Sequence, residues 1–126
     1  MYTMLLLANT IFETIIGVAM IFFGQYVLRT QDSLTLAVAR IFGVAVISIA
    51  AMSFVLLVFL RRNKGALLGG FVTLSIFHFG MAMVQAYNFT QGHANFADPI
   101  VHAIFAFLFI ASLVKEIHTG DMIYKP

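Results

Sequence analysis

The sequence predicts an all-α protein: a bundle of four antiparallel transmembrane helices with both termini in the cytoplasm. Hydrophobic residues make up 62% of the 126 residues and charged residues only 10%, against about 25% charged in an ordinary soluble domain. The mean hydropathy is +1.01. The hydrophobic residues fall into four long runs without an internal proline. Each run approaches the roughly 20 residues that a helix needs to cross a bilayer.

The predicted spans cover about residues 4–27, 41–60, 66–87 and 99–114, which together form a single integral membrane domain over residues 1–126. The first run is not expected to be a cleaved signal peptide, because no basic side chain precedes it and Glu13 interrupts it. The fourth run is the shortest, and we expect Asp98 to cap it and Pro99 to take its first helical position.

The basic residues predict the orientation of the spans. Residues 61–65, Arg-Arg-Asn-Lys-Gly, form a connection so short that it fits only an antiparallel helical hairpin. One side of the membrane holds five Lys and Arg and the opposite side holds Arg29 and Arg40, so the positive-inside rule places both termini in the cytoplasm. The five are Arg61, Arg62, Lys64, Lys115 and Lys125.

The composition also excludes several kinds of function. Cysteine is absent, which rules out disulfides, thiolate metal sites, iron–sulfur clusters and cysteine nucleophiles. The net charge is +2, but the basic residues lie at loop ends and form no stripe, so no nucleic-acid partner is expected. The expected partner is the lipid bilayer, and a bacterial inner membrane is the simplest localisation.

Glu13 and His78 are the first candidates for chemistry, because each is predicted near the middle of a span. An ionisable side chain at that depth is costly, so it generally faces the bundle interior and has a partner. Helical spacing places Asn9, Glu13 and Gly17 on one face, and Ser75 and Gln85 on the face of His78. The alternatives are a protonated Glu13 and a hydrogen-bonding His78 that serve helix packing alone.

A second set of candidates lies towards the outer surface. Asp98 and His102 are four residues apart on one helical face, so the carboxylate could orient the imidazole for acid–base chemistry or proton relay; alternatively, Asp98 only caps its helix. Arg40 and Gln85 are predicted at the same level, where they could bind the polar head of a ligand. For Arg40 the alternative is an interfacial anchor.

These residues predict a catalytic set of Glu13, His78, His102 and Asp98 and a ligand-binding set of Asn9, Arg40 and Gln85, if their faces converge on the bundle axis. Two histidines and one carboxylate could also ligate a metal, but they come from three helices without signature spacing. No metal and no cofactor are therefore predicted.

The segment 17–24, Gly-Val-Ala-Met-Ile-Phe-Phe-Gly, together with the four-span pattern, resembles the DoxX-like group of small membrane proteins. The resemblance implies a four-helix bundle and association with quinone or redox complexes, although the basic residue that often follows the second glycine is missing. The use of buried carboxylates and histidines also resembles membrane sterol isomerases and related EXPERA-type proteins. No functional position is carried over from either family.

The leading expectation for function is a buried acid–base site that binds or converts a lipophilic small molecule, by isomerisation, cyclisation or hydrolysis. Glu13 and His78 would exchange the proton, and His102 would be a second acid–base group. The alternatives are a non-catalytic subunit of a membrane complex, for quinone or redox chemistry or for transport, and a channel formed by a homo-oligomer.

Overall fold

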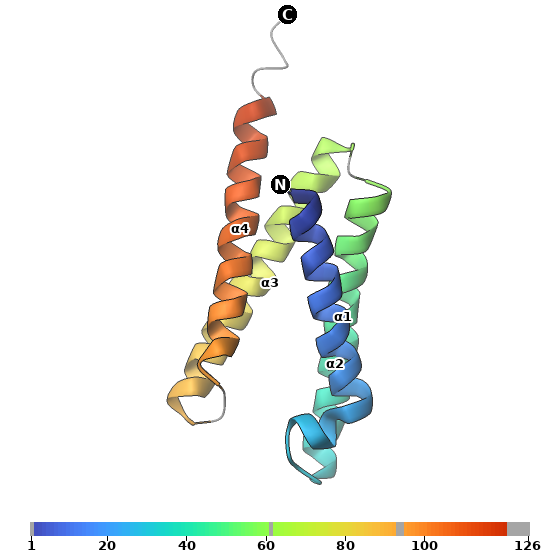
Figure 1. The fold of residues 1–126 in the computed structure, drawn as a ribbon, viewed down its shortest axis with the longest axis vertical. Helices are drawn as coiled ribbons and strands as arrows, with labels where there is room; N and C mark the ends of the chain where they lie inside the picture. Colours follow the sequence, from blue (N-terminus) through green and yellow to red (C-terminus); the bar gives the residue numbers. More distant parts are fainter. Residues whose placement is uncertain (1, 61, 93–94, 121–126) are drawn as a thin grey trace, which may run out of the picture. The chain divides into compact units, whose positions relative to one another are not determined.

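The computed structural model describes residues 2–60, 62–92 and 95–120, and within them it has four α-helices (Figure 1). These are α1 (Tyr2–Val27), α2 (Ser33–Val58), α3 (Lys64–Thr90) and α4 (Ala97–Gly120). All four are long and apolar enough to cross a membrane. The all-helical class and the four candidate spans are thus confirmed, and they indicate a multi-pass integral membrane protein. Arg61 and Lys125, used in the charge count, lie outside the described residues.

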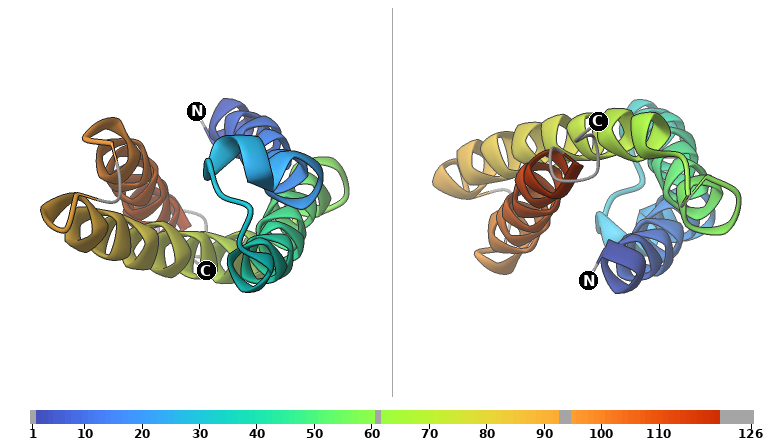
Figure 2. Two further views of the ribbon diagram at one scale, coloured as in Figure 1. Left: turned by 90° about the horizontal axis from the view of Figure 1, so that it is seen from below. Right: turned by 90° about the horizontal axis from the view of Figure 1, so that it is seen from above.

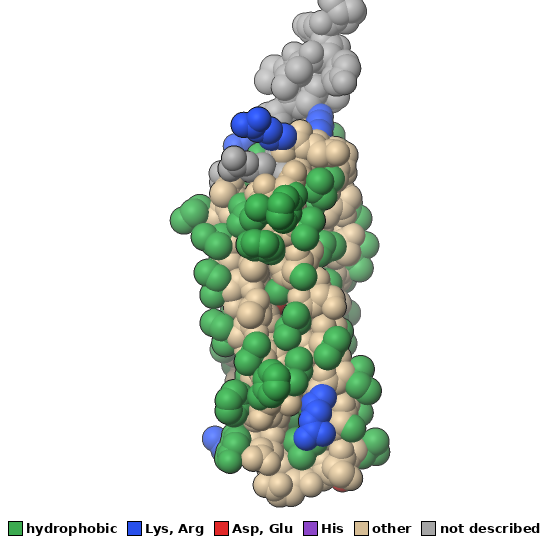
Figure 3. All heavy atoms as spheres, turned by 90° about the vertical axis from the view of Figure 1, so that its right-hand side faces the viewer, with side chains coloured by type: hydrophobic (Ala, Val, Ile, Leu, Met, Phe, Trp, Pro, Cys, Tyr) green, Lys and Arg blue, Asp and Glu red, His purple; other side chains and the backbone are tan. Residues whose placement is uncertain are grey.

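The exposed side chains agree with a hydrocarbon surrounding. Large hydrophobic residues are exposed on every helix, for example Phe22 on α1, Ile41 on α2, Phe79 on α3 and Phe107 on α4. Figure 3, a view from the right-hand side of Figure 1, shows a surface of hydrophobic side chains with lysine and arginine towards its two ends. Such a surface is stable in lipid and would be an aggregation surface in water.

All four helices are longer than the hydrophobic runs that predicted them, α2 and α4 most of all. α2 begins at Ser33 rather than near residue 41, so Arg40 lies within the helix. α4 begins at Ala97 and continues to Gly120, beyond residue 114. Hydropathy finds only the stretch that is free of charges, whereas a helix continues as long as its backbone hydrogen bonds do.

The contacts divide the chain into two compact units, one of residues 6–59 and one of residues 1–5 with 60–126. In the unit of residues 6–59, α1 lies beside α2 (Figure 2). A β-carbon added at Gly43 would lie 2.7 Å from the carbonyl oxygen of Gly17, so the two backbones nearly touch there. The buried amide Nδ2 of Asn9 donates a hydrogen bond of 2.8 Å to Ser53 Oγ. Small residues and interhelical hydrogen bonds of this kind hold membrane helices together.

In the other unit, α3 packs along α4, also visible in Figure 2. Phe71 on α3 meets the ring of Phe109 on α4, and Phe89 near the end of α3 meets Phe96 in the connecting turn. Tyr2, at the start of α1, packs its ring on Phe71, at 5.9 Å between centroids. Phe71 and Phe109 are fully buried and form the aromatic centre of this unit.

The start of α2 provides a prediction about pH. Asp32 is the N-cap, and its carboxylate accepts hydrogen bonds from the backbone N–H (2.7 Å) and the hydroxyl (2.6 Å) of Thr35. These bonds hold the pKa of Asp32 below its ordinary value. A lowered pKa stabilises the folded helix end above the ordinary pKa, and this contribution is lost as the pH falls through the lowered value. Hydrogen exchange, corrected for its intrinsic pH dependence, measures how often the first turn of α2 opens. This opening should increase as the pH falls over that range. In Asp32→Asn the opening should no longer depend on pH in this way.

Candidate functional site

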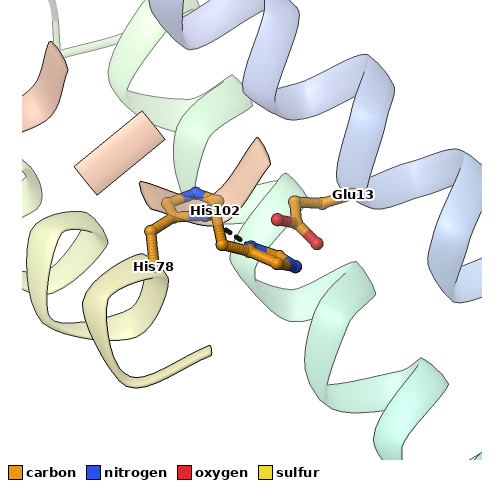
Figure 4. Close-up of side chains that lie close together, drawn as sticks. All are labelled: Glu13, His78 and His102. Carbon is orange, nitrogen blue, oxygen red and sulfur yellow. Dashed lines mark hydrogen bonds between the residues drawn. The ribbon is translucent and has the colours of Figure 1, made fainter. Parts of the chain in front are cut away.

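The most concentrated polar feature of the α3–α4 unit is a pair of buried imidazoles. His78 on α3 and His102 on α4 are 0% and 6% exposed. Their Nδ1 atoms lie 3.0 Å apart and form a hydrogen bond, drawn as a dashed line in Figure 4. The two rings lie at 5.3 Å between centroids with 33° between their planes. One direct contact thus joins two titratable groups inside the apolar interior.

The geometry of this bond restricts the protonation of the pair. A hydrogen bond between two Nδ1 atoms needs a proton on one of them and a lone pair on the other. In the neutral pair, the ring that donates through Nδ1 has an unprotonated Nε2, and the ring that accepts through Nδ1 carries its proton on Nε2. The pair therefore presents one hydrogen-bond acceptor and one donor at its two Nε2 atoms.

Phenyl rings surround the imidazoles. His78 stacks on Phe105 at 4.9 Å and 18°, and on Phe109 at 5.7 Å and 16°. Phe77 meets both imidazoles edge to face. Rings packed in this way fix the orientation of an imidazole and keep water away from it. Hydrogen bonds are stronger in such a low-dielectric setting.

His102 has a hydrogen-bonding partner that its spacing does not predict. Its Nδ1 is hydrogen-bonded to His78 Nδ1. Asp98 Oδ2 accepts a hydrogen bond of 3.2 Å from the backbone N–H of Asn95, as the acidic residue of a capping box does. The capping alternative for Asp98 agrees with this contact, although Asp98 lies inside the first turn of α4 and not at the N-cap. The predicted orientation of His102 by Asp98 stays a prediction.

Asn9 and Glu13 are both 0% exposed and lie on the face of α1 that also carries the buried Gly17. The buried face predicted from their spacing is therefore confirmed. Asn9 is hydrogen-bonded to Ser53 on α2, and its predicted part in ligand binding stays a prediction. Glu13 belongs to the α1–α2 unit and His78 to the other unit, so their predicted pairing stays a prediction.

The other two predicted ligand-binding residues lie in different units as well. Arg40 is exposed on α2, where it lines a hollow that residues of α1 complete. Gln85 is half-buried on α3, seven residues beyond His78. Their joint binding of a polar head stays a prediction.

A metal could be held by imidazole nitrogens in this unit. Imidazole suits zinc, copper, iron and nickel, and the second nitrogen of a ligating histidine is generally held by a hydrogen bond. By themselves, His78 and His102 supply two of the four ligands that a structural zinc usually takes. The hydrogen bond between their Nδ1 atoms is the contact expected of two imidazoles that share a proton.

The sequence identifies both histidines but not their pairing. His78 lies 12 residues before the end of α3 at Thr90, whereas His102 lies five residues after the start of α4 at Ala97. Counting residues outward from the turn therefore does not bring the two together, and their contact depends on how α3 packs against α4. The chain matches no family model, no curated protein and no solved structure.

Proposed function

We propose that the protein is an integral membrane acid–base catalyst in which the His78–His102 pair moves a proton within a lipophilic small molecule. The observation that carries this proposal is the 3.0 Å bond between the two buried Nδ1 atoms. A neutral pair of this kind can take a proton at one Nε2, pass a proton through the central bond and release one from the other Nε2. No net charge builds up on the pair, which suits an apolar environment.

Such a relay fits an isomerisation best. In an isomerisation one atom of the substrate loses a proton and another atom gains one, and the pair offers an acceptor and a donor at the same time. A positioned acid or base contributes about 10²–10⁴-fold to such a step. The surrounding phenyl rings of Phe77, Phe105 and Phe109 favour an apolar substrate. The proposed reaction needs no cofactor.

Glu13 is the proposed proton store of the site. A carboxylate near the middle of a membrane helix is generally partnered and functional, and Glu13 is the twelfth of the 26 residues of α1. Exchange of a proton between this carboxyl group and the imidazole pair would reset the tautomers after each turnover. The topology proposed with this function is an antiparallel four-span bundle in a bacterial inner membrane, with both termini cytoplasmic.

Solvent deuterium tests the proposal without a known substrate. The purified chain in bilayer nanodiscs is incubated in D₂O with a mixture of membrane-soluble ketones, including steroid and isoprenoid ketones, and mass spectrometry follows deuterium entering the carbon next to the carbonyl. Wild type should catalyse this exchange, and His78→Ala and Glu13→Gln should lose about 10²-fold or more. His118→Ala is the matched control, because His118 is exposed at the far end of α4.

Exchange at the wild-type rate in His78→Ala would contradict the proposed role of the pair. No exchange with any ketone, together with a stoichiometric heterologous partner in native mass spectrometry, would favour a non-catalytic subunit of a membrane complex instead.

A further inference from the structure

The α1–α2 unit carries a hollow where α1 changes direction. Phe23 has φ −123° and ψ 16°, outside the helical range, so the last turn of α1 leaves the line of the helix. Gly24 follows, and kinks are common where a glycine weakens a helix. Residues of both helices of this unit line the hollow, among them Phe22, Gly24, Gln25, Leu36 and Arg40.

Arg40 brings a positive charge into an apolar surface. It lies seven residues after Ser33, about 10 Å inside α2, and the neighbouring Val38, Ile41 and Val44 are exposed. Arg40 forms no hydrogen bond or ion pair with another described residue. A guanidinium in a membrane span generally pairs with an anion or reaches towards the interface. Here the guanidinium is available to an anion from the membrane.

Gln25 complements Arg40 on the opposite wall. Its side chain is half-buried and makes no hydrogen bond with another described residue. An amide NH₂ and a guanidinium fork are both donors, and a planar guanidinium binds two oxygens of a phosphate at once. The lining thus joins donors for a phosphate to the apolar Phe22 and Leu36.

We propose that this hollow binds the phosphate group of an anionic membrane phospholipid, through the Arg40 guanidinium and the Gln25 amide. The acyl chains lie along the exposed apolar side chains of α1 and α2. The site belongs to the α1–α2 unit alone, so it does not depend on the acid–base function.

Native mass spectrometry of the full chain, released from detergent micelles, tests this site. Wild type should retain phosphatidylglycerol about tenfold more than zwitterionic phosphatidylcholine, and Arg40→Gln should lose this preference. Arg29→Gln is the control, because Arg29 lies in the adjacent turn and does not line the hollow; it should behave as wild type. An equal concentration of inorganic phosphate should leave the bound lipid in place, and displacement would overturn the assignment to a lipid.

Two further variants keep the test decisive if Arg40→Gln folds poorly. Arg40→Lys retains the charge but not the fork that binds two oxygens, and Gln25→Leu removes the second donor. Both should retain less phosphatidylglycerol than wild type at unchanged helix content by circular dichroism. Retention at the wild-type level in both would show that the hollow is not the binding site.

Discussion

His78→Phe should both abolish proton transfer and destabilise the protein. Phenylalanine preserves the stacking on Phe105 and Phe109 but removes Nδ1, so it leaves the Nδ1 of the buried His102 without this bond. Loss of one partner of a buried hydrogen bond costs about 1–3 kcal/mol. Titration with a denaturing detergent, followed by circular dichroism, measures the change in the free energy of unfolding.

The double variant His78→Phe/His102→Phe separates stability from function. Because both polar partners are replaced by apolar rings, stability should recover to near the wild-type value or above it. Deuterium exchange into ketones should be lost in both single variants and in the double variant alike. If the destabilisations of the single variants simply add in the double variant, the two imidazoles do not interact.

Gly43→Ala should destabilise the α1–α2 unit. The new β-carbon would lie 2.7 Å from the carbonyl oxygen of Gly17, 2.8 Å from Ile21 Cγ1 and 3.1 Å from Met20 Cβ. A backbone oxygen cannot turn away as the end of a side chain can, so the helices must separate. Overpacking of this kind costs about 1–3 kcal/mol, which thermal unfolding in detergent would detect.

Gly24→Ala is the matched control for this substitution. A β-carbon at Gly24 would lie 3.6 Å from Leu36 Cδ2 and 3.7 Å from Ala39 Cβ, at ordinary contact distance. Stability should therefore change by less than about 0.5 kcal/mol. Equal effects at the two glycines would mean that α1 and α2 do not approach closely at Gly43.

The helical class could be predicted from the sequence because hydrocarbon leaves the backbone few choices. Four long apolar runs without internal proline determine four helices, and the spacing of Asn9, Glu13 and Gly17 determines their buried face. The helix ends were harder to predict. The charge of Arg40 placed the start of the second run at residue 41, although the Asp32 cap starts α2 at Ser33.

The candidate site could be predicted only as a set of residues. Depth and spacing singled out His78 and His102, but spacing along one helix favoured Asp98 as the partner of His102. The hydrogen bond with His78 comes from the neighbouring helix and depends on the register of α3 against α4. That register is fixed by tertiary packing, including the contact of Phe71 with Phe109. The periodicity of a single segment carries no information about such contacts between helices.

Nitrogen-15 NMR of the protein with labelled histidine, in lipid nanodiscs, reports directly on the proton shared by His78 and His102. We expect one protonated and one unprotonated Nδ1, with a scalar coupling between the two nitrogens across their hydrogen bond. A protonation state in which both Nδ1 atoms carry a proton, or neither does, together with no coupling between them, would contradict this expectation.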